Sequence, residues 1–102
     1  MKSRVKVEVF GAARNPRTGL NSVALQKYFS LVDYLQGSDV KDNVDLNFID
    51  TAVTNIDNYP AVKNALQQGQ PTPITVINGV VKYFGNIPYE AVYQDVKRTY
   101  AR

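Results

Sequence analysis

The chain has 102 residues, a formal net charge of +3, and neither cysteine nor histidine. The missing residue types exclude disulfides, thiolate nucleophiles, cysteine metal sites and a histidine general base, so we expect no metal, no cofactor and no enzyme built on these groups. With 44% hydrophobic residues, the chain suits a single domain, residues 1–102, that buries a core without cross-links. Charges interrupt the apolar residues of the N-terminus, which predicts a soluble, cytoplasmic protein with no membrane partner.

The beginning of the chain predicts a strand followed by a long helix. Residues 5–10 alternate valines with charged residues, which is the two-residue period of a strand. Apolar residues then recur at helical spacing over residues 24–35, and Asn21 or Ser22 can cap the start of this helix. We expect Gly37 to end the helix in a left-handed conformation.

The middle of the chain predicts a second strand and a short helix. Residues 44–50 alternate apolar and polar side chains, so they form the second strand. Asn58 and Pro60 mark the start of a helix, because proline is favoured in a first helical turn. Gly69 is expected to stop this helix after a short apolar face.

The last third of the chain predicts a β-hairpin and a final helix. Residues 74–77 and 80–84 are rich in β-branched and aromatic side chains. Asn78 and Gly79 lie between them and suit the positive φ angles of a type I′ turn. The final helix opens with Pro88 and repeats apolar residues at helical spacing.

The order β-α-β-α-β-β-α predicts an α/β fold with a mixed four-stranded sheet and helices on its faces. The first two strands should be parallel with a right-handed crossover, and the last two antiparallel through their tight turn. This arrangement, with a proline immediately before the third strand, resembles the thioredoxin fold. In that family a cis-proline at the position of Pro73 lies beside the loop after strand one, so the resemblance implies a cis peptide at Thr72-Pro73.

The segments NYPAVKNAL and TPITVINGVVKYFGNIP extend the likeness over nearly the whole chain. They resemble the arsenical-resistance metallochaperone and repressor family, and small bacterial disulfide oxidoreductases with a thioredoxin-like fold. In the thioredoxin register, the segment RNPR places Arg14 and Arg17 where the family has cysteines. In the arsenical register, Asn15, Pro16 and Asn21 occupy the cysteine positions. Disulfide exchange and arsenic binding both need thiolates, so neither activity carries over to this chain.

The loop between the first strand and the first helix is the candidate binding site. Arg14 and Arg17 precede a helix N-terminus, whose amide hydrogens and positive dipole end attract a phosphate or a carboxylate. Solvation of an exposed loop is the simpler alternative for these arginines. Asp50, at the end of the second strand, is better explained as a turn cap than as a catalytic base. The candidate binding residues are Arg14, Asn15, Arg17, Thr18, Thr72 and Pro73.

Three functions of different classes fit these residues. We favour a redox-inactive, thioredoxin-like module that binds a protein or peptide, or a second copy of itself, at a face formed by residues 13–22, Thr72-Pro73 and residues 85–88. The second is a dimeric DNA-binding regulator, which the resemblance to the arsenical repressors implies. Basic residues near the two termini can form a modest patch for nucleic acid if the chain ends lie close together. The third is an oxidoreductase-family protein whose cysteines were replaced. The basic residues near the termini are Lys2, Arg4, Lys6, Lys97, Arg98 and Arg102.

Overall fold

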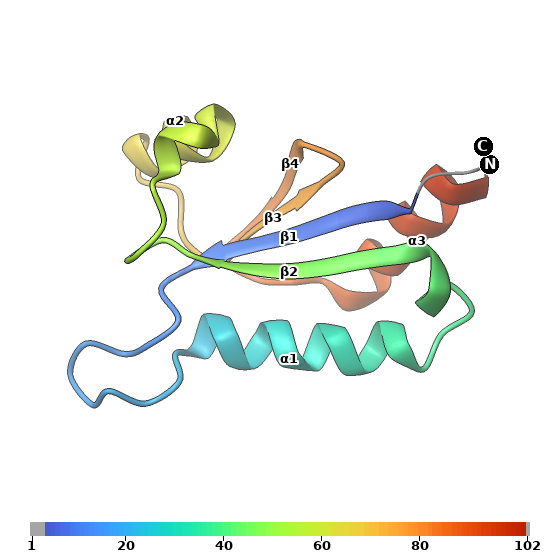
Figure 1. Cartoon of the computed structure of the whole chain (residues 1–102), viewed down its shortest axis with the longest axis horizontal. Coiled ribbons are helices and arrows are strands. Elements are labelled where there is room, and N and C mark those ends of the chain that lie inside the picture. Colours follow the sequence, from blue (N-terminus) through green and yellow to red (C-terminus); the bar gives the residue numbers. More distant parts are fainter. Residues whose placement is uncertain (1–3, 102) are drawn as a thin grey trace.

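A computed structural model describes residues 4–101 of the chain (Figure 1). The strands are β1 (Val5–Gly11), β2 (Val44–Asp50), β3 (Ile74–Ile77) and β4 (Val80–Phe84), and the helices are α1 (Val23–Gln36), α2 (Pro60–Gln67) and α3 (Tyr89–Ala101). This is the predicted order, with two short 3₁₀ turns added, η1 (Lys41–Asn43) and η2 (Ile56–Asn58). No helix within residues 4–101 is long and apolar enough to cross a membrane.

The four strands form one mixed sheet in the order β2-β1-β3-β4. β1 and β2 run parallel, with Val7 opposite Leu46, as the predicted β-α-β unit requires. β3 runs antiparallel to β1 and to β4. The predicted mixed four-stranded sheet is therefore confirmed, and the central strand β1 is hydrogen-bonded on both sides.

The hairpin between β3 and β4 turns where the sequence predicts it. Ile77 pairs with Val80, so only Asn78 and Gly79 lie in the turn. Their φ angles are 49° and 82°, the positive values that a type I′ turn requires. The register shifts between Thr75 and the next residue, which marks a bulge in this otherwise regular pair.

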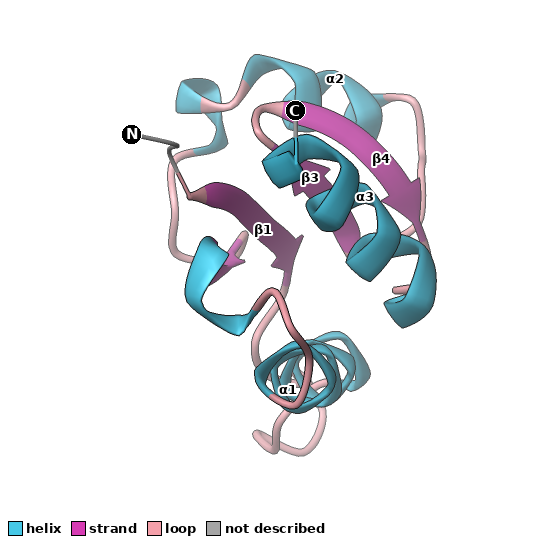
Figure 2. Cartoon of the chain, turned by 90° about the vertical axis from the view of Figure 1, so that its right-hand side faces the viewer, coloured by secondary structure: helices cyan, strands magenta, loops and turns pink. Residues whose placement is uncertain are grey.

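Helices cover both faces of the sheet and bury two apolar clusters (Figures 1 and 2). Because successive side chains of a strand point to opposite faces, β1 contributes to both clusters. The larger cluster lies under α1 and α3 and contains Val5, Val7, Val9, Leu31, Leu35, Val40, Val44, Ile77, Ile87, Val92 and Val96. The smaller cluster lies under α2 and contains Phe10, Val62, Ala65, Ile74 and Val76.

The prediction for the ends of α1 is confirmed at the N-terminal end and wrong at the C-terminal end. The Ser22 hydroxyl accepts a hydrogen bond from the Leu25 amide at 3.0 Å, so Ser22 is the N-cap and Asn21 is not. The prediction of a left-handed Gly37 was wrong, because its φ is −87°. The Ser38 hydroxyl instead donates to the carbonyl of Leu35 at 2.7 Å, and this bond satisfies the helix end without a left-handed residue.

Candidate functional site

The Thr72-Pro73 peptide bond is cis, as the resemblance implied. The segment around it is fixed by Gly85, whose amide donates to the carbonyls of Pro71 at 3.0 Å and Pro73 at 2.9 Å. Gly85 has a φ of +76°, and a Cβ atom built on it would lie 3.0 Å from Cγ of Pro71. Only glycine satisfies both conditions without strain. The turn after β4 and the segment before β3 are therefore locked together.

The backbone of Thr72 has no partner of its own. Neither its amide nor its carbonyl forms a hydrogen bond within residues 4–101, and its side chain is exposed. Pro73, by contrast, is buried. A free donor and a free acceptor on an extended, exposed residue can pair with another chain in the manner of a strand edge.

The loop between β1 and α1 closes on itself. Arg14 and Asn21 form an isolated antiparallel bridge, and the Asn15 amide donates to the carbonyl of Leu20 at 2.8 Å. The Asn15 side chain also accepts from the Arg17 amide at 2.8 Å, which makes an Asx turn. These bonds give the loop a defined shape although most of its residues are exposed.

Asp50 anchors this loop to the end of β2. Its Oδ1 atom accepts from the amide of Ala13 at 3.2 Å and from the amide of Ala52 at 3.0 Å. The second bond caps the turn that follows the strand, so the prediction of a turn cap is confirmed. The carboxylate therefore positions the start of the candidate loop.

A hollow of about 360 Å³ lies where the loop, the start of α1 and the cis-proline segment meet. Five of the six predicted site residues line it, and Lys27 and Val23 of α1 complete one wall. Thr18 does not line the hollow, because it lies at the loop tip, where its hydroxyl accepts from the Leu20 amide at 3.2 Å. The predicted residues that line it are Arg14, Asn15, Arg17, Thr72 and Pro73.

Three cationic side chains surround this hollow, and no acidic side chain of the described chain lines it. The Arg14 guanidinium donates to the carbonyl of Gly19 at 3.0 Å, and Lys27 reaches the carbonyl of Gly85 at 3.5 Å. The Arg17 guanidinium has no hydrogen bond or ion pair within residues 4–101. The hollow is thus a positively charged surface with one guanidinium open to a ligand.

The sequence did not indicate Lys27 or Val23 as part of this site. Val23 is 64% exposed although it lies in the first turn of α1. Lys27 follows it by four residues and so lies on the same face of the helix. That spacing was available in the sequence, but which helical face turns toward Thr72-Pro73 depends on how α1 packs on the sheet.

The basic residues near the termini are largely paired with acids. Arg4 forms an ion pair with Asp45 at 3.1 Å, and Lys97 forms one with Asp39 at 3.0 Å. Arg98 is bonded to the carboxylate of Asp95 three residues earlier. These pairs reduce the positive charge that a DNA backbone would meet. Lys2 and Arg102 lie outside the described residues.

Several titratable groups with shifted pKa values hold α3 in place. Hydrogen bonds from the hydroxyl of Tyr93 at 2.7 Å and from Lys97 at 3.0 Å lower the pKa of Asp39. The bonds that Lys97 donates to Asp39 and to the Tyr93 hydroxyl raise the pKa of Lys97. Burial and a hydrogen bond to Asp95 raise the pKa of Tyr83 to about 12. These bonds join α3 to β4 and to the connector after α1, and none of these residues lines the hollow.

The comparisons with known proteins show the fold and nothing finer. No family model and no curated protein matches this sequence. A crystal structure of a protein of unknown function from Staphylococcus aureus, SA0789, superposes with a TM-score of 0.70 and 15% sequence identity. The superposition covers 98% of this chain and 94% of that one. The arrangement of the described elements is therefore shared over nearly the whole length of both chains.

Proposed function

We propose that this protein is a redox-inactive, thioredoxin-like module that binds an extended protein segment carrying a carboxylate. The order β2-β1-β3-β4, with only β3 reversed, and the cis peptide before β3 support the thioredoxin-like assignment. The chain has no cysteine, so the scaffold has no thiolate with which to exchange disulfides. Binding is the function that its remaining groups can perform.

The observation that carries the proposal is the convergence of the predicted residues on one hollow beside an unpaired backbone. The amide of Thr72 can donate, and its carbonyl can accept, a backbone hydrogen bond with an extended segment. The guanidinium of Arg17 then supplies a charge-assisted bond to an acidic side chain, and Lys27 adds a second cation to the lining of the hollow. Loops on a rigid scaffold commonly carry binding, and this one is fixed by its own hydrogen bonds.

An NMR titration of the full chain tests this site with two blocked peptides, acetyl-Val-Glu-Val-amide and its glutamine counterpart. The glutamate peptide should shift the amide signals of Thr72 and of residues 13–22. The double variant Arg14→Ala, Arg17→Ala should weaken its binding at least about tenfold, because a hydrogen bond to a charged group is worth about 1.5–3 kcal/mol. The glutamine peptide should bind more weakly and respond less to the double variant.

The matched control is the double variant Lys41→Ala, Lys82→Ala, which removes the same charge from exposed positions outside the hollow. Equal weakening by both double variants would mean that only net charge matters, and signal shifts elsewhere would place binding at another surface. Size-exclusion chromatography separates the two sources of the segment. If the parent protein is a dimer and the arginine variant is a monomer, the bound segment comes from a second copy of the chain. If the parent is a monomer, the segment comes from a different protein.

The redox part of the proposal has its own assay. Disulfide exchange needs an attacking thiolate, and the sequence contains none. The purified chain should therefore reduce insulin disulfides with dithiothreitol no faster than dithiothreitol alone. A rate above this background would contradict the assignment as a redox-inactive module.

A further inference from the structure

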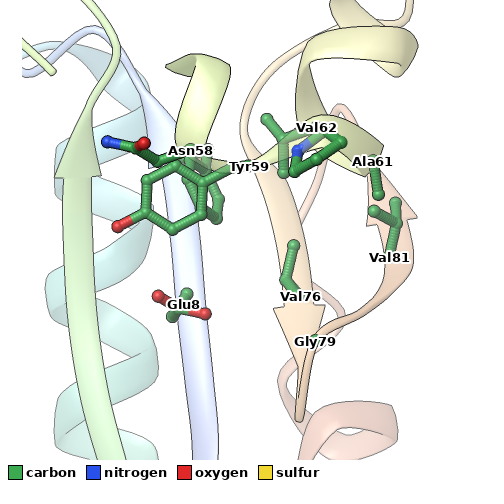
Figure 3. A pocket seen from close by; sticks show the side chains of 10 residues that line it. Glu8, Asn58, Tyr59, Ala61, Val62, Val76, Gly79 and Val81 are labelled. Atoms are coloured by element: carbon green, nitrogen blue, oxygen red, sulfur yellow. The ribbon is translucent and has the colours of Figure 1, made fainter. Parts of the chain in front are cut away.

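A second, smaller groove lies on the opposite face of the sheet, where α2 leaves part of the surface uncovered (Figure 3). Its volume is about 220 Å³. Three of its lining residues are neighbours across the sheet, because Glu8 of β1 pairs with Val76 of β3, and Val76 pairs with Val81 of β4. The segment that starts α2 supplies much of the remaining lining. The groove is lined by Glu8, Phe10, Asn58, Tyr59, Pro60, Ala61, Val62, Val76, Gly79 and Val81.

Glu8 is the unusual member of this lining. Its side chain is half-buried in the centre of the sheet, next to the buried Val76. It has no hydrogen bond or ion pair within residues 4–101, and Lys6, two residues earlier on the same strand face, does not pair with it. A half-buried carboxylate without a protein partner can accept a charge-assisted hydrogen bond from a cation, and partial shielding from water strengthens that bond.

Tyr59 adds a second feature, an aromatic wall beside the carboxylate. Its ring packs edge-on against Phe10, with the ring centroids 4.9 Å apart and the planes at 71°. Figure 3 shows the Glu8 carboxylate below this ring, with Val76, Val81 and Ala61 on the other side of the groove. The ring therefore adds apolar surface beside the carboxylate, against which the body of a ligand can pack.

The size of the groove limits what it can hold. Pockets for drug-sized ligands have volumes of about 300–1,000 Å³, and this groove is smaller. It therefore suits one ring or a short aliphatic chain with a single charged group. We propose that the groove binds a small primary amine with an apolar body, of the arylalkylamine class, with its ammonium group on Glu8 and its body against Tyr59, Val76 and Val81.

NMR titration of the full chain with 2-phenylethylamine tests this site, and 2-phenylethanol serves as the uncharged probe of nearly the same shape. The amine should shift signals of the lining residues, and Glu8→Gln should weaken its binding about tenfold, the factor expected for loss of one charge-assisted bond. The alcohol should bind weakly and equally to both proteins. Glu90→Gln, on the exposed first turn of α3, is the matched charge control and should bind the amine like the parent.

A second variant tests the position of the apolar body. Ala61 is exposed on α2 and lines the groove, so Ala61→Leu should fill the space without disturbing the core and should weaken both probes. Equal amine affinity for the parent and Glu8→Gln would overturn the proposal. So would signal shifts confined to residues outside the groove, or unchanged binding in Ala61→Leu. None of these outcomes depends on the hollow beside Thr72.

Discussion

Replacing Gly85 by alanine should destabilise the protein more than the same change at any other left-handed glycine of the chain. An L-residue in the left-handed region is unfavourable by about 1–2 kcal/mol, and restriction of the unfolded chain offsets about 0.4–1 kcal/mol of this. At Gly85 the new Cβ also lies 3.0 Å from Cγ of Pro71, and such overpacking adds about 1–3 kcal/mol. We therefore expect Gly85→Ala to lower the free energy of unfolding by about 2–4 kcal/mol.

Gly69→Ala is the matched control for this variant. Gly69 also has a positive φ, +80°, but a Cβ there meets nothing within 4 Å. Its substitution should lower the free energy of unfolding by only about 1 kcal/mol. Urea unfolding followed by circular dichroism measures both variants, and equal m-values would show that the two transitions expose similar surface. Equal urea midpoints would refute the argument, because they would mean that the Pro71 ring moves aside without resistance.

Three further substitutions test other interactions that hold the fold. Because the pKa of Tyr83 is raised to about 12, the native state holds this proton more tightly than the unfolded state. Tyr83 should therefore account for a loss of about 1 kcal/mol of stability as the pH rises from about 10 to about 12, and Tyr83→Phe should reduce the alkaline loss by this amount in urea titrations. The raised pKa of Lys97 contributes to the loss that remains. Ser22→Ala removes the cap on the Leu25 amide and should lower the free energy of unfolding by about 1 kcal/mol in the same assay. Leu31→Ala leaves a cavity at a fully buried position and should lower it by about 2–5 kcal/mol.

Two of these substitutions, Tyr83→Phe and Ser22→Ala, have a counterpart at an exposed position. Tyr34→Phe is the counterpart of Tyr83→Phe, because the Tyr34 side chain is exposed and its hydroxyl has no hydrogen bond within residues 4–101. Equal effects of the two substitutions on stability at alkaline pH would mean that the bond to Asp95 does not hold the proton of Tyr83. Ser30→Ala, on the exposed side of α1, should change stability little. A Ser22→Ala variant as stable as Ser30→Ala would show that the cap is not needed.

The elements with a clear period were predictable because one physical cause dominates each of them. The alternation of apolar and polar side chains predicted β1 and β2. The pair Asn78-Gly79 predicted the hairpin turn, because few other residues accept positive φ angles. The two 3₁₀ turns were missed, because three residues are too few to show a period. Gly37 was assigned the wrong conformation because the competing bond from the Ser38 hydroxyl depends on the path of the chain after the helix.

The candidate site was predictable in part for a similar reason. Topology brings the loop after β1 to the segment before β3, so Arg14, Arg17 and Pro73 could be placed together from the order of elements. The contribution of Lys27 depends on the rotation of α1 about its axis, which no local pattern records. The groove beside Glu8 depends on how much of the sheet α2 leaves bare, and that is a property of packing alone.

The unequal apolar clusters on the two faces of the sheet imply that the protein does not open as one unit. α2 has eight residues and rests on the smaller cluster, whereas α1 and α3 share the larger one. A short helix with few buried side chains detaches at a lower free energy than the rest of the fold. In hydrogen exchange, the amide of Ala65, inside α2, would then exchange before those of Val92 and Val96. Local opening of α2 would expose Phe10 while the rest of the fold stays intact. A molecule bound between Tyr59 and Glu8 would slow this opening, because it would contact both the start of α2 and the strand β1.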